Sequence, residues 1–302
     1  MTRHVELWLG TVVEIGVEAP PSEPPEAGIA AAFAAIARVH RALSLHDPAS
    51  ELSQVNRDAP YGVRAISADL RAVLSCALEL GARSRGSFDP TVGGRVAALG
   101  FLPPQAPSER GVSWRDVELT ARGVRFAQPL VLDFGGIAKG YAVDCAVDAL
   151  RGHGVSAGRV NAGGDLRIFG LQSERVHVRT GGPQGILLPL VELADGAVAT
   201  SAYGGQRRRV GRRWATPLIE PRSGLPMMST RTVSVVAPTC MVADALTKVV
   251  ALRGSTAAGM LAAYGASATV LSPAAGRWRC ARLPHSNPAS VRPVMSQMPA
   301  TA

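Results

Sequence analysis

The sequence lacks the features that mark a membrane span, a disulfide scaffold or a disordered chain. No run of about eighteen apolar residues occurs, so no membrane-spanning helix is expected. The four cysteines lie far apart without a CxxC pair, and the apolar surroundings of Cys76 and Cys145 predict buried free thiols rather than zinc ligands or disulfides. Charged residues are only 18% and hydrophobic residues 47% of the 302 positions. This composition predicts a globular protein with a substantial core.

Aromatic residues are also few, at 5%, although the chain carries a net charge of +9. Because none interleaves with the basic residues as a stacking platform, we do not expect a nucleic-acid partner. An anionic nucleotide or an acidic protein partner fits the local basic cluster better, and a solvated loop fits it equally well. The cluster consists of Arg207, Arg208, Arg209, Arg212 and Arg213.

The amino-terminal residues alternate in polarity like a strand and show no continuous apolar region or small-residue cleavage site. We therefore expect no exported leader and a cytoplasmic location.

The segment Val131–Asp144, VLDFGGIAKGYAVD, is the most informative part of the chain. An apolar run ends in Asp133, two glycines follow, and a helical pattern begins near Ile137. Glycines allow close approach of a ligand, and first-turn amides together with Lys139 favour negative charge. A similar turn follows at Val160–Asp165, VNAGGD. Two such turns indicate a nucleotide or flavin ligand, with a divalent metal as a further possibility.

Other motifs fit less well. Asp133-Phe134-Gly135 copies the kinase metal-binding triplet, but no HRD loop or VAIK-like strand accompanies it. The glycines match neither GxxxxGK[ST] nor GxGxxG. A tight strand-to-helix connection without a ligand stays open for this segment taken alone.

Periodicity and turn residues predict the elements. Ser67 is expected to cap a helix that Gly81 closes. Strands should dominate from Arg159 to Ala199, and a domain over residues 1–285 should precede a disordered tail, 286–302. The expected helices are 29–43, 67–80, 137–151, 241–252 and 256–264, and the expected strands include 6–18, 116–126, 130–133, 232–236, 267–271 and 277–282.

Six sequence blocks, in order and at matching spacing, resemble the ApbE family, the FAD:protein FMN transferases. VLDFGGIAKGYAVD and NAGGD are the most specific of them. The resemblance covers residues 6–285. The remaining blocks are LSLHDPASEL at residues 43–52, FDPTVG at 88–93 with Gly100-Phe101, IEPRSG at 219–224 and ADAL at 243–246.

The resemblance implies an α+β, T-fold-like architecture of two lobes with a flavin cleft between them. It implies magnesium-dependent transfer of FMN from FAD to a Thr or Ser hydroxyl of an acceptor protein. Asp89 and Thr91 would brace the cleft. By the same resemblance, Asp133 and Lys139 contact FAD, and Asn161, Gly163, Gly164 and Asp165 form a facing wall. Leu43, Leu218 and Ile219 line the pocket. The Gly136 carbonyl and Asp244 hold Mg²⁺, with Thr247, one residue before the family's threonine position, as a substitute ligand.

Three departures from the family pattern bear on catalysis. Lys248 stands where a threonine is expected four residues after Asp244, so its ammonium could pair with Asp244 where magnesium would lie. Pro217 replaces a histidine that is the candidate base, which leaves Glu220 as the best substitute. The loop at residues 200–206, TSAYGGQ, lacks the family's acidic residue.

Two functions therefore stay open. One is an active transferase, and the other is a catalytically impaired FAD-binding protein on the same fold. Individual residues also have simpler explanations: Asp89 could cap a turn, Asp165 could close the Gly163-Gly164 turn by its own backbone bonds, and Asp244 could be an ordinary first-turn carboxylate.

Overall fold

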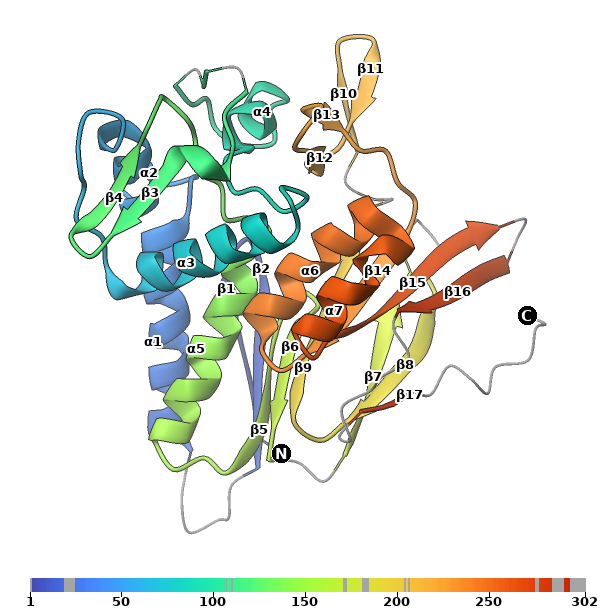
Figure 1. Ribbon diagram of the computed structural model, residues 1–302. Coiled ribbons are helices and arrows are strands. Elements are labelled where there is room, and N and C mark those ends of the chain that lie inside the picture. Colours follow the sequence, from blue (N-terminus) through green and yellow to red (C-terminus); the bar gives the residue numbers. More distant parts are fainter. Residues whose placement is uncertain are drawn as a thin grey trace. The chain divides into compact units, whose positions relative to one another are not determined.

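Helices and strands divide into two units in the computed structural model (Figure 1). The structure describes residues 2–18, 25–106, 108–109, 111–170, 173–180, 185–203, 205, 207–274, 277–283 and 291–293. The mixture confirms the predicted α+β class. Unit 1 consists of Met1–Ala37, Lys139–Gly205 and Ser229–Ala302, and unit 2 consists of Arg38–Ala138 and Gln206–Met228.

Unit 1 is built on an eight-stranded sheet whose neighbouring strands all pair antiparallel. The β-branched run of β14 suits a central strand, and all its residues are buried. The order is β1 (Thr2–Trp8), β2 (Thr11–Glu18), β5 (Ala157–Ala162), β6 (Asp165–Phe169), β9 (Gly196–Ala202), β14 (Thr232–Ala237), β15 (Ser267–Ala274) and β16 (Arg277–Leu283).

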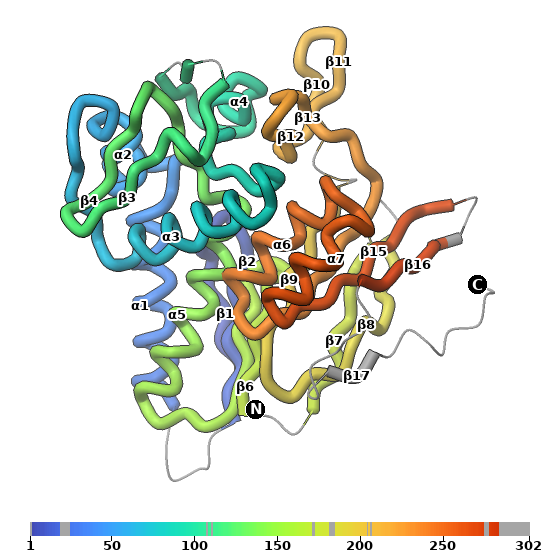
Figure 2. Tube along the Cα trace, viewed as in Figure 1, coloured from blue at the N-terminus to red at the C-terminus, as the bar shows by residue number. Residues whose placement is uncertain are grey.

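The strands around β14 are covered on both faces, which explains why β14 is buried throughout, whereas the edge strand β1 is mostly exposed. Helix α6 (Cys240–Arg253) packs on β6, β9 and β14, and α7 (Ala258–Ala263) follows it against β15 (Figure 2). A smaller sheet of β7 (Glu174–Arg179), β8 (Leu187–Leu193) and β17 (Val291–Pro293) contributes to an apolar cluster with the large sheet. The large sheet supplies Ile168, Val198, Val236 and Leu271 to that cluster.

The single strand predicted for residues 6–18 is wrong, because a hairpin of β1 and β2 occupies this region. Leu9 and Gly10 both have positive φ, 56° and 71°, and form a two-residue turn between the paired residues Trp8 and Thr11. Such a turn matches the twist of a hairpin. Polarity alternates on both sides of it, so the pattern concealed the reversal.

Unit 2 carries the remaining short helices and hairpins. The predicted 29–43 helix is confirmed as α1 (Glu26–Leu43), which begins in unit 1 and ends in unit 2. Unit 2 also contains α2 (Glu51–Asp58), α3 (Ala68–Arg83), α4 (Gly93–Ala98), η1 (Trp114–Asp116), β3 (Val117–Thr120), β4 (Gly123–Phe126), β10 (Arg208–Val210), β11 (Arg213–Ala215), β12 (Ile219–Glu220) and β13 (Leu225–Pro226).

Helix α3 begins as predicted but ends later. The Ser67 hydroxyl accepts a hydrogen bond from the Leu70 amide at 3.2 Å, which confirms the cap. Gly81 does not close the helix, which continues to Arg83. A Cβ at position 81 would lie 2.8 Å from Cγ of Trp114, so glycine is required here for close packing rather than for termination.

Two further strand predictions in unit 2 are wrong. Residues 116–126 form two strands, β3 and β4, around a turn at 121–122. Residues 130–133 form no regular strand, and only Val131 makes a bridge, to Val92. The side chain of Asn56 takes the place of a neighbouring strand, because it accepts from the Leu132 amide at 2.9 Å and donates to the Leu132 carbonyl at 3.0 Å.

The later elements of unit 1 agree closely with the sequence. The predicted helix 137–151 is α5 (Ala138–Gly152), the helix 241–252 is α6, and the helix 256–264 is η2 (Gly254–Ala257) followed by α7. The terminal hairpin is β15 and β16, and its expected loop residues 275–276 lie outside the described residues. So does the predicted disordered tail, apart from β17.

In the part of the chain that the structure describes, no helix is both long enough and apolar enough to cross a membrane.

Gly140 of α5 packs directly against the backbone at the start of α6. A substitution at this position tests the packing of the two helices. A Cβ at position 140 would lie 2.3 Å from the Cys240 carbonyl oxygen, whereas a Cβ at Gly152 in the same helix would meet nothing within 4 Å. We expect Gly140→Ala to lower the free energy of unfolding by about 3 kcal/mol, because backbone cannot yield to the added methyl. Gly152→Ala should change it by less than about 1 kcal/mol. Equal denaturation midpoints for the two variants would contradict this packing.

Candidate active site

The second glycine turn places Asp165 at the start of β6. Gly163 and Gly164 have φ of 62° and 102°, in the region that favours glycine, and a Cβ at 163 would lie 2.5 Å from the Thr11 hydroxyl. The Asn161 side chain closes the turn by accepting from the Gly164 amide at 3.0 Å. The alternative that Asp165 closes this turn is therefore wrong, and its carboxylate is directed to a lysine instead.

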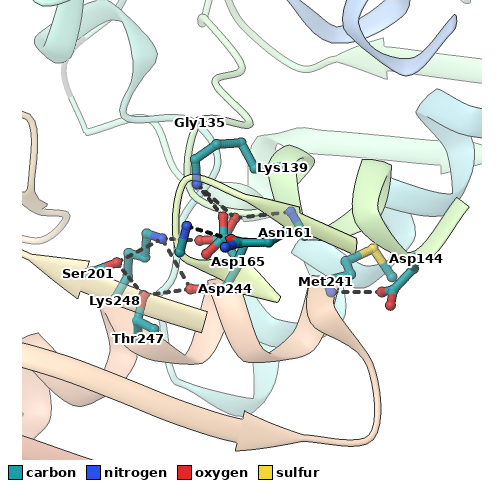
Figure 3. Close-up of polar contacts among 12 residues, drawn as sticks. Gly135, Lys139, Asp144, Asn161, Asp165, Ser201, Met241, Asp244, Thr247 and Lys248 are labelled. Atoms are coloured by element: carbon teal, nitrogen blue, oxygen red, sulfur yellow. Dashed lines mark hydrogen bonds and ion pairs between the residues drawn. The ribbon is translucent and has the colours of Figure 1, made fainter. Parts of the chain in front are cut away.

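Helices α5 and α6 carry the other charged residues of the site. Asp144 on α5 accepts hydrogen bonds from the Cys240 and Met241 amides, at 2.9 and 2.8 Å, and so caps the amino terminus of α6 from a different helix (Figure 3). Arg167 donates to the same carboxylate at 2.8 Å. Burial raises the pKa of Asp144, while these amides and Arg167 act in the opposite direction.

Four charged side chains meet beside the contact between α5 and the start of α6, which we call the helix joint. Lys139 Nζ lies 2.5 Å from Asp165 Oδ2 and 3.6 Å from Asp244 Oδ2, and Lys248 Nζ contacts Asp244 Oδ1. The carboxylate side chains of Asp165 and Asp244 are only 3% and 1% exposed. The lysine side chains, at 32% and 19%, keep some access to solvent. We call Lys139, Asp165, Asp244 and Lys248 the ionic cluster; two negative and two positive charges balance within it.

The cluster shifts the pKa values of its members. Burial lowers the pKa of Lys139, but the charges of Asp244 and Asp165 outweigh it, and the net shift is upward. Burial opposes ionisation of Asp244, yet Lys139 and Lys248 hold its pKa below the ordinary value. Burial and the charge of Asp244 raise the pKa of Asp165 to about 6, so this carboxyl is still mainly ionised at neutral pH. Lys139 and both aspartates therefore carry charge in the folded protein.

Lys248 fulfils the prediction that it pairs with Asp244. Its ammonium also donates to the Asp244 carbonyl at 3.1 Å and to the Ser201 hydroxyl at 3.4 Å. The Thr247 hydroxyl donates to the Asp244 carbonyl at 2.7 Å and lies 2.9 Å from the Ser201 hydroxyl. The simpler explanation of Asp244, as a first-turn carboxylate, does not account for these contacts.

The donor set does not fit the implied magnesium ion. Mg²⁺ requires an octahedral set of oxygen ligands. Each Asp244 oxygen already faces an ammonium group, and the Thr247 hydroxyl points to its own helix backbone. Across the described ranges, no group of three or more His, Cys, Asp or Glu side chains is arranged to hold a metal. Gly136, the third implied ligand, lies in a turn of unit 2.

In unit 2, the first glycine turn, which follows Asp133, is hydrogen-bonded to the FDPTVG segment. The Asp133 amide donates to the Pro90 carbonyl at 2.7 Å, and the Asp133 carboxylate accepts from the Gly135 amide at 2.8 Å. Asp89 accepts from the Thr91 amide and hydroxyl, at 2.9 and 2.7 Å, and from the Trp114 amide at 3.1 Å. Asp89 therefore caps its own turn, as the simpler explanation expected, and also holds the Trp114 amide; a bracing role of Asp89 and Thr91 at a cleft stays a prediction.

The remaining implied residues also lie in unit 2. Leu43, Leu218 and Ile219 are buried, so they belong to its core, and a pocket-lining role stays a prediction. Glu220 accepts from the Arg222 and Ser223 amides, at 3.2 and 2.6 Å. Slight burial opposes ionisation of Glu220, but these hydrogen bonds give a net lowering of its pKa.

The five arginines of the basic cluster are all exposed, on or next to the β10–β11 hairpin. Arg208 also donates to the Gly100 carbonyl, and its guanidinium lies 5.6 Å from the centre of the Phe101 ring. The sequence interpretation overlooked Trp214, which is 58% exposed and pairs with Arg209 across the hairpin. All four cysteines are thiols outside any disulfide, as predicted, but only Cys240 is buried, so the predicted burial of Cys76 and Cys145 is wrong.

Sequence reasoning missed two residues that organise the site, Asp144 and Ser201. Asp144 ends the VLDFGGIAKGYAVD block and lies four residues after Gly140, on the same face of α5. That spacing was the available signal. No local signal marks Ser201, because its role depends on the packing of β9 against α6.

A matched pair of substitutions tests the cap that Asp144 provides. Asp144→Asn leaves one oxygen for two amides and Arg167, so we expect a loss of about 2 kcal/mol in the free energy of unfolding. Asp148→Asn, on an exposed position one turn further along α5, should change it by less than about 0.5 kcal/mol. Chemical denaturation measures both; a stable Asp144→Asn protein would rule out the cap as a main anchor of α6.

An antiparallel sheet packed against helices and a second, smaller sheet, with an ionic cluster beside a glycine turn, defines an α+β protein with a Lys–Asp site. The chain belongs to the ApbE family, whose family model matches residues 9–271.

Two curated relatives share this sequence pattern. An FAD:protein FMN transferase of Rhodobacter capsulatus is 30% identical over 264 residues, which are 81% of this chain and 50% of the relative. The chain thus spans about half the length of that protein. An FAD:protein FMN transferase of Vibrio cholerae is 31% identical over 231 residues, 69% of this chain and 68% of the relative.

Solved structures confirm the fold. The flavin transferase ApbE from Vibrio cholerae superposes with a TM-score of 0.81 at 22% identity, covering 93% of this chain and 96% of that chain. The ApbE protein from Thermotoga maritima gives 0.78 at 24% identity, covering 89% and 93%.

Proposed function

We propose that this chain is an FAD:protein FMN transferase. In this reaction an acceptor Thr or Ser hydroxyl attacks the FMN phosphorus, the bond to the AMP phosphate breaks, and AMP leaves as FMN becomes a phosphoester of the acceptor. The observation that carries the proposal is the ionic cluster, which is built from the two most specific family blocks together with α6. Residues 1–285 would form the transferase domain.

The chain's own residues would supply charge and alignment. Phosphoryl transfer through a loose transition state depends mainly on positioning and on neutralising negative charge. Lys139 and Lys248 are partly exposed and would face the diphosphate of FAD, while Asp165 and Asp244 hold the two ammonium groups in place. Asp133, Asn161, Gly163 and Gly164 stay the proposed flavin contacts, and Leu43, Leu218 and Ile219 the proposed lining of the pocket.

Glu220 stays the candidate base for the acceptor hydroxyl. Its lowered pKa makes it a weak proton acceptor. A loose transition state demands little activation of the attacking hydroxyl, so a weak base is compatible with slow transfer. A Thr or Ser acceptor site and a cytoplasmic location stay predictions from the sequence. The Mg²⁺ predicted at Asp244, Thr247 and the Gly136 carbonyl is not part of this proposal, because the donor set does not fit the ion.

A second candidate, an impaired FAD-binding protein, is favoured by one observation. Pro217 replaces the expected histidine, and Lys248 forms an ion pair with Asp244. The presumed base and the carboxylate ligand of the metal are therefore both affected. FAD binding without release of AMP would identify this function.

A transfer assay tests the enzyme. The purified 302-residue chain is incubated with FAD, Mg²⁺ and a threonine-containing acceptor protein, and both AMP release and flavin fluorescence on the denatured acceptor are measured. We expect Lys139→Ala to reduce transfer about 100-fold, because a cationic contact to the diphosphate is lost. Asp195→Asn, which removes an exposed partner of Arg151, is the control and should transfer normally. Absence of labelled acceptor and of AMP with the unmodified chain would refute the proposal.

A further inference from the structure

The ammonium of Lys248 lies among three oxygen atoms of unit 1. It contacts Asp244 Oδ1, and it donates to the Asp244 carbonyl at 3.1 Å and to the Ser201 hydroxyl at 3.4 Å. A lysine ammonium has three N–H donors and no acceptor. The three oxygens therefore match its full hydrogen-bonding capacity, and they form a cation site that is filled by a side chain of the protein itself.

Charge balance favours this arrangement over a bound metal. The two buried carboxylates of the ionic cluster are neutralised by Lys139 and Lys248. A divalent cation added at Asp244 would place an excess of positive charge in a region where Asp244 is almost completely buried. Uncompensated buried charge is strongly unfavourable, so the ion would have to displace Lys248 from all three oxygens.

The use of lysine here is selective. The sequence contains only two lysines, Lys139 and Lys248, and the other 30 basic residues are arginines. Lysine presents a compact point charge with rotatable donors, whereas the flat guanidinium of arginine suits two parallel contacts. Both lysines belong to the ionic cluster. A point cation is the property that this site requires and that arginine does not provide.

We propose that Lys248 is a tethered cation that replaces a divalent metal at Asp244, so that this chain binds the diphosphate of FAD without Mg²⁺. The exclusion of metal depends only on the ionic cluster. The part that concerns FAD rests on the proposed function.

Metal binding without flavin gives the first test. The 302-residue chain is titrated with Mn²⁺, and free Mn²⁺ is followed by electron paramagnetic resonance, with Mg²⁺ calorimetry alongside. We expect no stoichiometric uptake by the unmodified chain and uptake of one ion by Lys248→Thr, which vacates the cation site and adds a hydroxyl ligand. Arg253→Thr, near the end of the same helix, should behave like the unmodified chain. Stoichiometric uptake by the unmodified chain overturns the proposal, whatever the variants do.

FAD binding gives the second test, measured by quenching of flavin fluorescence. The dissociation constant of the unmodified chain should be the same in EDTA and in Mg²⁺. Lys248→Thr should bind FAD about tenfold more weakly in EDTA, as expected for loss of a positive charge beside the diphosphate, and Mg²⁺ should restore the affinity. Lys248→Met keeps the side-chain volume without the charge, and Mg²⁺ should not restore its affinity. A strong loss of affinity for FAD when EDTA is added to the unmodified chain overturns the proposal that this chain binds FAD without a metal.

The two tests separate the two proposals. A chain that excludes Mn²⁺ but ignores FAD refutes the transferase proposal and the metal-free binding of FAD, and it leaves intact the exclusion of metal by Lys248. A chain that transfers FMN only with Mg²⁺ refutes the tethered cation and supports the transferase. Thermal melting of both Lys248 variants establishes that they are folded before binding is compared.

Discussion

The buried negative charge of Asp244 is the constraint around which unit 1 is organised. A carboxylate that is 1% exposed is tolerated only when opposite charges and hydrogen bonds surround it. Lys248 from the same helix, Lys139 from α5 and, more weakly, the Gly140 amide at 3.4 Å provide them. Asp165 then balances Lys139. Each of the four charges depends on its neighbours, so the ionic cluster forms as a whole.

The four charges of the ionic cluster come together only if α5, which carries Lys139, and α6, which carries Asp244 and Lys248, are held at a fixed separation. Gly140 allows the two backbones to approach, and Asp144 holds the first amides of α6. Arg167 on β6 reaches the same carboxylate, so the sheet strand that carries Asp165 is tied to the helix joint. The strand, the two helices and the four charges are thus parts of one structural unit, and a change at the joint is transmitted to the charges.

The departures from the family pattern acquire a physical meaning in this setting. Lys248 is not simply the loss of a threonine ligand, because its ammonium satisfies the oxygens that a metal would need. Glu220 does not simply replace a missing histidine, because its carboxylate stabilises its own turn. The first departure conserves positive charge at the site, whereas the second supplies only a weak base. Charge neutralisation is therefore better preserved in this chain than proton transfer.

The sequence by itself determined the α+β class, the family, the helices α1, α5 and α6, and the pairing of Lys248 with Asp244. These depend on local patterns: helical periodicity, glycine-containing motifs and a four-residue spacing on one helix face. The hairpin turn at Leu9-Gly10, the continuation of α3 past Gly81 and the irregular segment at residues 130–133 were decided by tertiary contacts. So were the roles of Asp144 and Ser201, which arise only when residues about 50 to 100 positions apart are brought into hydrogen-bonding distance.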